Sequence, residues 1–213
     1  MPTTLKGNCY LCGKELGKTA MKNHVLKAHA DPEAGQKCYL LKIEGAYDKN
    51  YWLLADVPLD AILTSVDRFL RKIWLECCGH LSKFQGFGKS RKLSALSVGD
   101  SFLHEYDFGT TTETLITVIA ETARKKQKEA VRLLARNVPL QFECAACGKP
   151  ATAICIECAY EVDNPFFCDV CADVHEHDDM LLPVVNSPRM GECGYDGELD
   201  TYSFNPDAYK GKI

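Results

Sequence analysis

The sequence predicts an α+β fold in which an antiparallel sheet packs on one main helix, with a small cysteine-rich module at each end. Residues 36–140 alternate short runs of strand-forming residues with one amphipathic helical stretch. Nine of the twelve cysteines lie outside that stretch, so the ends of the chain follow a different chemistry. With 213 residues, 46% of them hydrophobic, the chain is long and apolar enough for an ordinary core, and wholesale disorder is excluded.

The middle of the chain contains the predicted sheet. Residues 38–43 and 51–57 are rich in strand formers and are separated by turn-forming residues, which predicts a hairpin. Three further strands are expected over 102–108, 113–121 and 131–136. Residues 125–136 also fit a helix by periodicity, and that alternative stays open here.

The main helix is predicted to begin at Pro58. Apolar residues recur from there at steps of three and four, while charged residues occupy the other side. The apolar stripe consists of Leu59, Ile62, Val66, Phe69, Leu70 and Ile73. Such a stripe buries one side of the helix against the sheet.

The order of these elements resembles the Ri-plasmid ORF-three-like family, whose members are also labelled insertion-element passenger or TnpR-family proteins. The resemblance covers about residues 38–140 and rests on His80-Leu-Ser-Lys-Phe84 and Tyr106-Asp-Phe-Gly109. The pattern in better-known members continues with Asp, then Trp and His, whereas this chain has Thr110 and no such Trp or His. The resemblance implies an α+β fold and an association with plasmids or mobile elements, and it implies no particular activity.

Residues 1–31 have the ligand spacing of a two-Cys, two-His zinc finger. Cys9 and Cys12 are followed by His24 after eleven residues and by His29 after four more. Two thiolates on a short loop and two imidazoles on a helix can close a tetrahedron around one zinc ion. A module this small has little core of its own, so metal binding would supply its folding energy. A purely structural knuckle is an equally good interpretation.

This N-terminal segment is basic, with five lysines against one glutamate in residues 1–30. The lysines expected to face nucleic-acid phosphates are Lys14, Lys18, Lys22 and Lys27. One finger contacts only about 3 base pairs, so it would need help to be specific. A solvated basic face on a protein-contacting finger is therefore the alternative.

Residues 141–186 contain three Cys-x-x-Cys pairs followed by two histidines, which makes eight candidate ligands for two zinc ions. The ligands are Cys144, Cys147, Cys155, Cys158, Cys168, Cys171, His175 and His177. Their order resembles a B-box or a similar cross-braced module. That resemblance implies one site made by the first and third cysteine pairs, and a second made by the middle pair with both histidines.

The membership of the second site is open, because Asp173, Asp178 or Cys193 can each replace one histidine. A single zinc ribbon built from two cysteine pairs is the simpler alternative. In either arrangement four protein ligands leave no open position on the metal, so the zinc is expected to be structural. With the finger, about three zinc ions are expected in all.

The C-terminal module is strongly acidic. Residues 141–213 carry fourteen acidic side chains against four basic ones, whereas the net charge of the whole chain is −4. Such a surface repels phosphates and favours a protein partner. Residues 187–213 form a turn-rich acidic tail, and we expect the part from Thr201 onward to be loose.

A catalytic site in the middle region is the competing hypothesis. Residue types for a thiol nucleophile, its base and an orienting carboxylate occur there in Cys77, Cys78, His80, His104 and Asp107. The segment 83–92 interleaves basic and aromatic residues as a nucleic-acid-binding loop does, although a solvated loop is more usual.

The favoured hypothesis is a zinc-binding, non-enzymatic adaptor that contacts nucleic acid, protein or both. An accessory structural protein of a mobile element is the third hypothesis. The sequence shows neither an export signal nor a membrane span, and repeated Cys-x-x-Cys pairs suit a reducing compartment, so a cytoplasmic location is expected.

Overall fold

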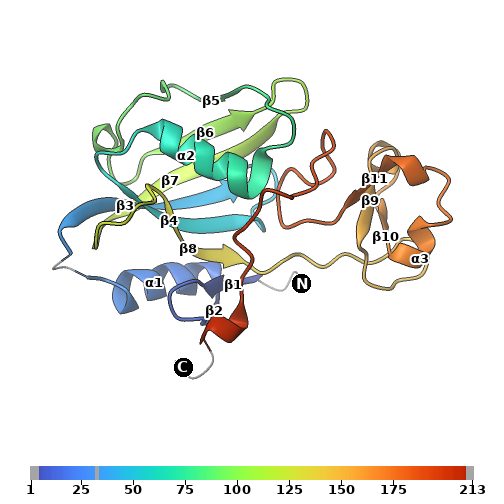
Figure 1. Ribbon diagram of the computed structural model, residues 1–213, viewed down its shortest axis with the longest axis horizontal. Coiled ribbons are helices and arrows are strands. Elements are labelled where there is room, and N and C mark those ends of the chain that lie inside the picture. The colour runs from blue at the N-terminus through green and yellow to red at the C-terminus, as the bar shows by residue number, and fades with distance from the viewer. Residues whose placement is uncertain (1–4, 32–33, 210–213) are drawn as a thin grey trace.

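The computed structural model describes residues 5–31 and 34–209, and an eight-stranded antiparallel sheet is its centre (Figure 1). The strand order is β2-β1-β8-β4-β3-β7-β6-β5. The strands are β1 (Lys6–Cys9), β2 (Glu15–Gly17), β3 (Gln36–Gly45), β4 (Trp52–Pro58), β5 (Ser82–Phe84), β6 (Ser101–Tyr106), β7 (Thr112–Arg124) and β8 (Arg132–Asn137). The predicted antiparallel sheet is confirmed, including the hairpin formed by β3 and β4.

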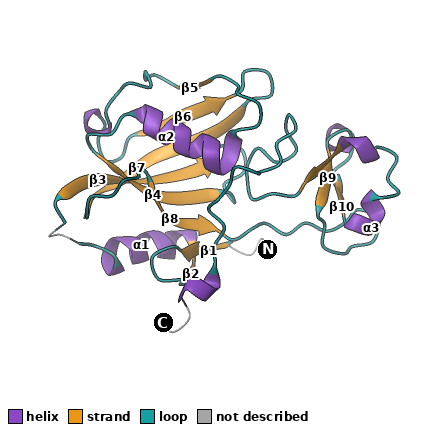
Figure 2. Ribbon diagram, in the orientation of Figure 1, coloured by secondary structure: helices purple, strands orange, loops and turns teal. Residues whose placement is uncertain are grey.

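Helices cover both faces of this sheet (Figure 2). Helix α1 (Lys18–Ala28) lies on one face, and α2 (Leu63–Leu70), continued by a π-helical turn (Arg71–Leu75), lies on the other. The short 3-10 turns are Leu93–Ala95, Cys158–Tyr160, Asp178–Met180 and Pro206–Tyr209. The sequence predicted one main helix after Pro58 and a helix that carries the two finger histidines, and the structure places the second of these, α1, on the opposite face of the sheet.

Two apolar cores result, one on each face of the sheet. Because side chains alternate along a strand, Leu40 and Leu54 pack towards α1, while Leu41 and Leu53 pack towards α2. Every residue of β4 is buried. Continuous burial of this kind is expected when both faces of a strand are covered.

The helix predicted from Pro58 begins later in the structure. Strand β4 includes Pro58, and residues 59–62 form a connection in which Ile62 makes a bridge with Lys92. Pro58 therefore ends a strand, at a position that pairs with Cys38 of β3 and lies beyond Asp56, where the pairing of β4 with β8 stops. The alternative helix over 125–136 is not formed, because residues 132–137 are strand β8.

The N-terminal segment is continuous with the central sheet. Strand β1 pairs with β8 from Gly7 opposite Asn137 to Cys9 opposite Ala135. Gly7 has no side chain, and a Cβ there would lie 2.5 Å from the ring of Trp52. This strand therefore lies directly against the aromatic core beneath α1.

The C-terminal module stands apart from the sheet at one end of the molecule (Figure 1). It contains a three-stranded sheet of β9 (Ala153–Cys155), β10 (Phe166–Phe167) and β11 (Leu181–Pro183), with the short helix α3 (Asp169–Ala172). Its buried apolar residues are few, namely Cys144, Ile154, Cys155, Cys168 and Ala172.

The chain then returns to the central sheet, and its described tail is held there. The hydroxyl of Tyr10 donates to the carbonyl of Tyr202 at 2.5 Å, and the hydroxyl of Tyr209 donates to the carbonyl of Tyr10 at 2.7 Å. Phe204 packs its ring against both Tyr10 and Tyr209. The expectation of a loose segment after Thr201 is therefore wrong for the residues up to Tyr209, because aromatic contacts fix them.

Candidate metal centres

The structure brings cysteines and histidines together in four sets, each able to hold a metal ion. Three of them are the sets expected from the sequence, which we name the N-terminal set (Cys9, Cys12, His24, His29), the all-cysteine set (Cys144, Cys147, Cys168, Cys171) and the mixed set (Cys155, Cys158, His175, His177). The fourth, the bridging set, consists of Cys77, Cys78, His80 and Cys193. Within each set the ligand atoms lie within 4.8 Å of one another.

The spacing of these atoms fits a tetrahedral zinc ion. Bonds of about 2.3 Å to sulfur and about 2.0 Å to nitrogen place two sulfurs about 3.8 Å apart, and a sulfur and a nitrogen about 3.5 Å apart. All twelve cysteines are free thiols, so disulfides do not account for the sets. The ligand types, thiolate and imidazole, are those that zinc prefers.

In the N-terminal set, a strand end and a helix present the ligands. Cys9 ends β1, His24 lies within α1, and His29 caps the C-terminus of that helix. The Sγ of Cys12 lies 3.2 Å from Nε2 of His24, and the Sγ of Cys9 lies 3.4 Å from Nε2 of His29. The two histidine Nε2 atoms are 3.1 Å apart. These separations place all four ligands around one point.

This set is built into the core of the protein. Cys9 is fully buried, and burial raises the pKa of its thiol to about 11. Met21 and Val25 of α1 pack beside it against Trp52 and Leu134 of the sheet. The contacts of Met21 are therefore with the core of the sheet and not with a separate core of a finger.

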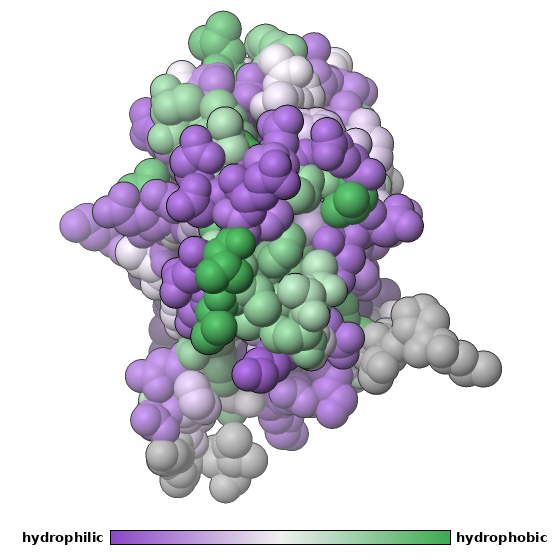
Figure 3. Space-filling view, turned by 90° about the vertical axis from the view of Figure 1, so that its right-hand side faces the viewer, coloured by the Kyte–Doolittle hydropathy of each residue, from purple (hydrophilic) through white to green (hydrophobic). Residues whose placement is uncertain are grey.

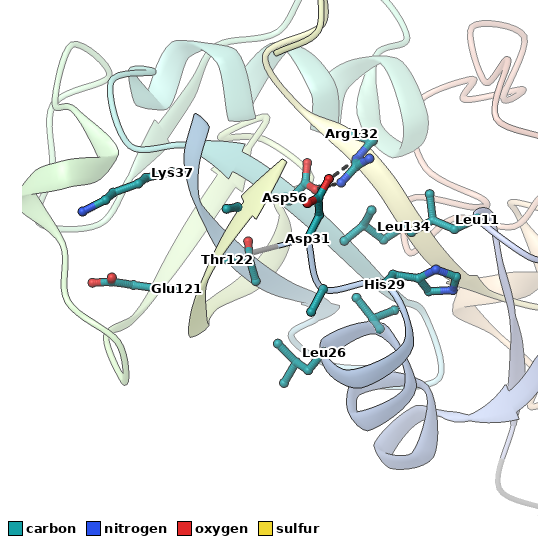
Figure 4. Close-up of a pocket in the computed structure, with 13 residues that line it drawn as sticks. Leu11, Leu26, His29, Asp31, Lys37, Asp56, Glu121, Thr122, Arg132 and Leu134 are labelled. Atoms are coloured by element: carbon teal, nitrogen blue, oxygen red, sulfur yellow. Dashed lines mark hydrogen bonds and ion pairs between the residues drawn. The ribbon is translucent and has the colours of Figure 1, made fainter. Parts of the chain in front are cut away.

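A cavity of about 380 Å³ opens beside His29, between α1 and the sheet (Figure 4). Leu26 and Leu134 contribute apolar wall, and Asp56 lies at one side. Asp56 accepts hydrogen bonds from Arg124 and Arg132, so its charge is already matched. The cavity gives solvent access to one edge of the N-terminal set, and Asp31, Lys37 and Glu121 also line it.

The four lysines predicted to face phosphates are not equivalent. Lys14 and Lys27 are exposed, and Lys22 is half-buried. Lys18 is occupied within the protein, since its Nζ lies 2.6 Å from Glu44 Oε1 and donates to the carbonyl of Lys49 at 2.6 Å. Only part of the expected basic face is therefore available to a partner.

The all-cysteine set combines the first and third cysteine pairs. Cys147 Sγ lies 3.6 Å from Cys168 Sγ and 3.7 Å from Cys171 Sγ, near the edge of a zinc–sulfur tetrahedron. The backbone N–H of Cys168 lowers the pKa of Cys144 to about 6. Contact with the side chain of Cys147 instead raises the pKa of Cys171 to about 12. A bound cation would relieve this crowding of thiols by stabilising all four as thiolates.

The mixed set combines the middle cysteine pair with both histidines. Cys158 Sγ lies 3.4 Å from His175 Nε2 and 3.7 Å from His177 Nδ1, and Cys155 Sγ lies 3.9 Å from the same Nδ1. The cross-braced order expected from the B-box resemblance matches this grouping. Among the alternative ligands, Cys193 belongs to a different set.

The bridging set was not anticipated from the sequence. Cys78 and His80 lie just after the π-helical turn, and Cys193 lies in the tail. Nε2 of His80 is 3.0 Å from Cys78 Sγ and 3.1 Å from Cys193 Sγ. The adjacent cysteines at 77 and 78 lack the Cys-x-x-Cys spacing that marks the other sets, and Cys193 has no cysteine close to it in sequence.

The catalytic hypothesis loses support from the same geometry. His104 is fully buried and pairs with Asp67 at 2.8 Å. Oδ2 of Asp107 lies 3.4 Å from Nε2 of His80, and this is the same nitrogen that faces Cys78. An orienting carboxylate in a catalytic triad binds the opposite ring nitrogen. The side chain of Cys77 also raises the pKa of Cys78 to about 11, whereas a nucleophilic thiol needs a lowered pKa.

The basic and aromatic segment 83–92 is also largely engaged within the protein. Lys83 pairs with Glu105 at 2.9 Å and Lys89 pairs with Asp67 at 3.0 Å. The guanidinium of Arg91 stacks over the ring of Phe87. These contacts fit the interpretation of a structural loop.

Comparison with known proteins adds no functional name to these sites. No protein-family model matches the chain, and no curated protein matches its sequence. A crystal structure of a protein of unknown function from Methanosarcina mazei Go1 is similar in part, with 19% identity and a TM-score of 0.42. The similar region covers 47% of this chain and 69% of that one.

In the described part of the chain, none of the helices has the length and apolar character needed to cross a membrane.

Proposed function

We propose that this protein is a zinc-stabilised, non-enzymatic adaptor that binds a protein partner through its C-terminal module. The observation that carries the proposal is the pair of four-ligand sets within that one small module. Four protein ligands close the coordination of a zinc ion and leave no position for substrate or activated water. The metal then acts by holding a surface in shape.

That surface combines exposed apolar side chains with acidic ones. The end of the molecule formed by the module carries an apolar patch surrounded by hydrophilic residues (Figure 3). The exposed apolar residues of the module are Tyr160, Val162, Val170, Val174 and Met180. Val174 is 83% exposed and Val170 is 72% exposed, although valine is usually buried. An apolar centre with a polar rim is typical of protein interaction sites.

The charge of the module defines the partner. Its exposed acidic residues include Glu161, Asp163, Asp169, Asp173 and Glu176. These carboxylates repel phosphates, so direct nucleic-acid binding is disfavoured at this end. A protein segment that carries lysine or arginine beside apolar side chains matches the surface best.

A model peptide tests this proposal directly. The zinc-loaded full chain is titrated with a fluorescent peptide of alternating lysine and leucine, and with its glutamate and leucine counterpart, at two salt concentrations. We expect salt-sensitive binding of the lysine peptide alone. Val170→Ser plus Val174→Ser should weaken it roughly tenfold, since truncated apolar contacts at an interface centre cost about 1–2 kcal/mol.

The matched control is Val98→Ser, which changes a 52% exposed valine of the middle region. It should leave binding unchanged, and all variants should keep the wild-type zinc content. Equal binding of both peptides, or no effect of the double change, would contradict the proposal.

Nucleic-acid binding by the N-terminal segment is the alternative, and the exposed Lys14 and Lys27 favour it. Binding of random-sequence DNA and RNA at two salt concentrations tests it, because phosphate contacts give a steep salt dependence. Lys14→Glu plus Lys27→Glu should abolish such binding. Lys126→Glu plus Lys128→Glu, at exposed positions on the connection between β7 and β8, makes the same charge change as a control.

The association with a plasmid or mobile element is a separate proposal that rests on the resemblance of residues 38–140 alone. It predicts that the gene lies beside transposition or plasmid-maintenance genes. A survey of gene neighbours that finds none of these would remove it.

A further inference from the structure

We propose that Cys77, Cys78, His80 and Cys193 form a fourth zinc site, which ties the returning tail to the central sheet and thereby fixes the position of the C-terminal module. This site goes beyond the adaptor proposal, which uses only metal held within the module. The adaptor surface and the fourth site can each fail without the other.

The ligand separations are those of a tetrahedral site. Cys77 and Cys78 Sγ atoms are 3.8 Å apart, and Cys78 and Cys193 Sγ atoms are 3.9 Å apart. A zinc ion bound to two thiolates holds the sulfurs about 3.8 Å apart. A disulfide requires about 2.05 Å, so neither pair is bonded. Three thiolates and one imidazole are a ligand combination found in structural zinc sites.

The backbone on both sides is arranged to present these ligands. Gly79, with φ of +85°, turns the chain between Cys78 and His80, and its N–H donates to Glu76 at 2.6 Å. Cys193 itself has φ of +47°, a left-handed conformation that is uncommon for a residue with a Cβ. Strained backbone of this kind persists where the surrounding structure holds it, and often at binding sites.

A buried cation lies beside the set. A divalent ion bound by three thiolates and a neutral imidazole leaves one excess negative charge. The guanidinium of Arg189 is fully buried, with Nη2 3.5 Å from Cys77 Sγ and 2.8 Å from Asp107 Oδ2. It pairs with Asp107 and also reaches Cys77, so it reduces the negative charge around the set without cancelling it, and it holds the tail at the sheet four residues before Cys193.

The turn that carries Cys193 also touches the C-terminal module. A Cβ on Gly191 would lie 3.0 Å from Cδ1 of Ile154 in strand β9. The turn is anchored on its other side by Ser187, whose hydroxyl donates to the carbonyl of Trp74 at 2.6 Å. A metal ion at the bridging set therefore locks a turn that lies between the sheet and the module.

The test is the zinc content of the full chain, measured by elemental mass spectrometry. Cys78→Ser and Cys193→Ser should each lose one zinc ion per chain relative to the wild type. The double variant should also lose one and not two, because both residues serve the same ion. Cys38→Ala is the matched control, since this cysteine belongs to none of the described sets and should cost no zinc.

A conservative variant separates ligation from folding. Cys193→His keeps a metal ligand at a position whose backbone histidine tolerates, and it should restore the zinc ion that Cys193→Ser loses. Cobalt loading should give a wild-type minus Cys193→Ser difference spectrum with thiolate-to-cobalt charge-transfer and tetrahedral ligand-field bands. Equal zinc content in wild type and both single variants, loss of two ions in the double variant, or an oxidised Cys78–Cys193 pair that withstands chelation would overturn the proposal.

Discussion

The two ends of this chain use the same ligand chemistry in opposite structural settings. The N-terminal set lies on a strand and a helix that belong to the central architecture, with Cys9 and Met21 fully buried. The C-terminal module has its own small sheet and few buried apolar residues. Metal ligation would therefore add to an existing core at one end and take the place of a core at the other.

Removal of zinc should produce the largest effect and the sharpest contrast. Structural zinc contributes on the order of 10 kcal/mol to small modules, so exhaustive chelation should unfold residues 141–183. Strands β3, β4 and β7 should stay protected, because their core does not depend on metal. Hydrogen exchange followed by mass spectrometry measures this, and equal loss of protection at both ends would break the comparison.

Truncation of Met21 should come next in size. Met21→Ala removes a fully buried side chain packed against the sheet, so unfolding should become easier by about 2–5 kcal/mol. Val174→Ala, at an 83% exposed position of the C-terminal module, should change stability by less than about 0.5 kcal/mol. Urea titration of both zinc-loaded variants measures the difference. Equal effects would mean that α1 does not share the sheet's core.

A methyl group on Gly7 should show how closely β1 fits the core. Gly7→Ala would place a Cβ 2.4 Å from the carbonyl of Arg136 and 2.5 Å from the ring of Trp52. Overpacking of this kind costs about 1–3 kcal/mol or more. Gly17→Ala is the control at the end of β2, where a Cβ meets nothing within 4 Å. Thermal unfolding of the two variants should therefore diverge.

Titration with acid should show that two buried groups of the central region make a smaller, metal-independent contribution to the pH dependence of stability. Burial works to raise the pKa of Asp67, but hydrogen bonds from His104, Ser82 and Lys89 outweigh it and hold that pKa below its ordinary value. Burial lowers the pKa of His104 against the opposing attraction of Asp67. Both shifts mean that the unfolded chain binds more protons, so stability falls as pH drops below about 6.5 for the histidine and about 3.9 for the carboxylate.

Asp67→Asn should reduce the loss of unfolding free energy between pH 7 and pH 3 by about 1–2 kcal/mol. Asp60→Asn, at an exposed position, should leave that loss unchanged. Urea titrations between pH 7 and pH 3 provide the curves. Identical slopes for wild type and Asp67→Asn would show that Asp67 does not contribute to the acid sensitivity.

Local patterns in the sequence were sufficient for much of this structure. Runs of strand-forming residues and the turn residues between them located the hairpin of β3 and β4, and Cys-x-x-Cys spacing located the three expected ligand sets. Those signals are local because each depends on residues within a few positions of one another. The start of α2 was misplaced, since Pro58 ends a buried strand and does not begin the helix.

The features that were missed all depend on distant contacts. Pairing of β1 with β8 leaves no local trace in either strand, and it decides that α1 covers the second face of the sheet. The bridging set joins Cys193 to His80 across 113 positions. Its nearest signal is Cys193 in a glycine-rich turn, and the sequence alone offers this cysteine only as a substitute ligand for the mixed set.

The closure of the tail over the N-terminal segment sets an order of events during synthesis. Tyr10 and Tyr202 are separated by 192 positions, and translation adds about 5–20 residues per second, so roughly 10–40 s pass between the two. For most of that interval β1 has no strand β8 to pair with. For all of it, the tail that will contact Tyr10 is absent. The first ligand pair to leave the ribosome thus belongs to the last part of the molecule to be completed.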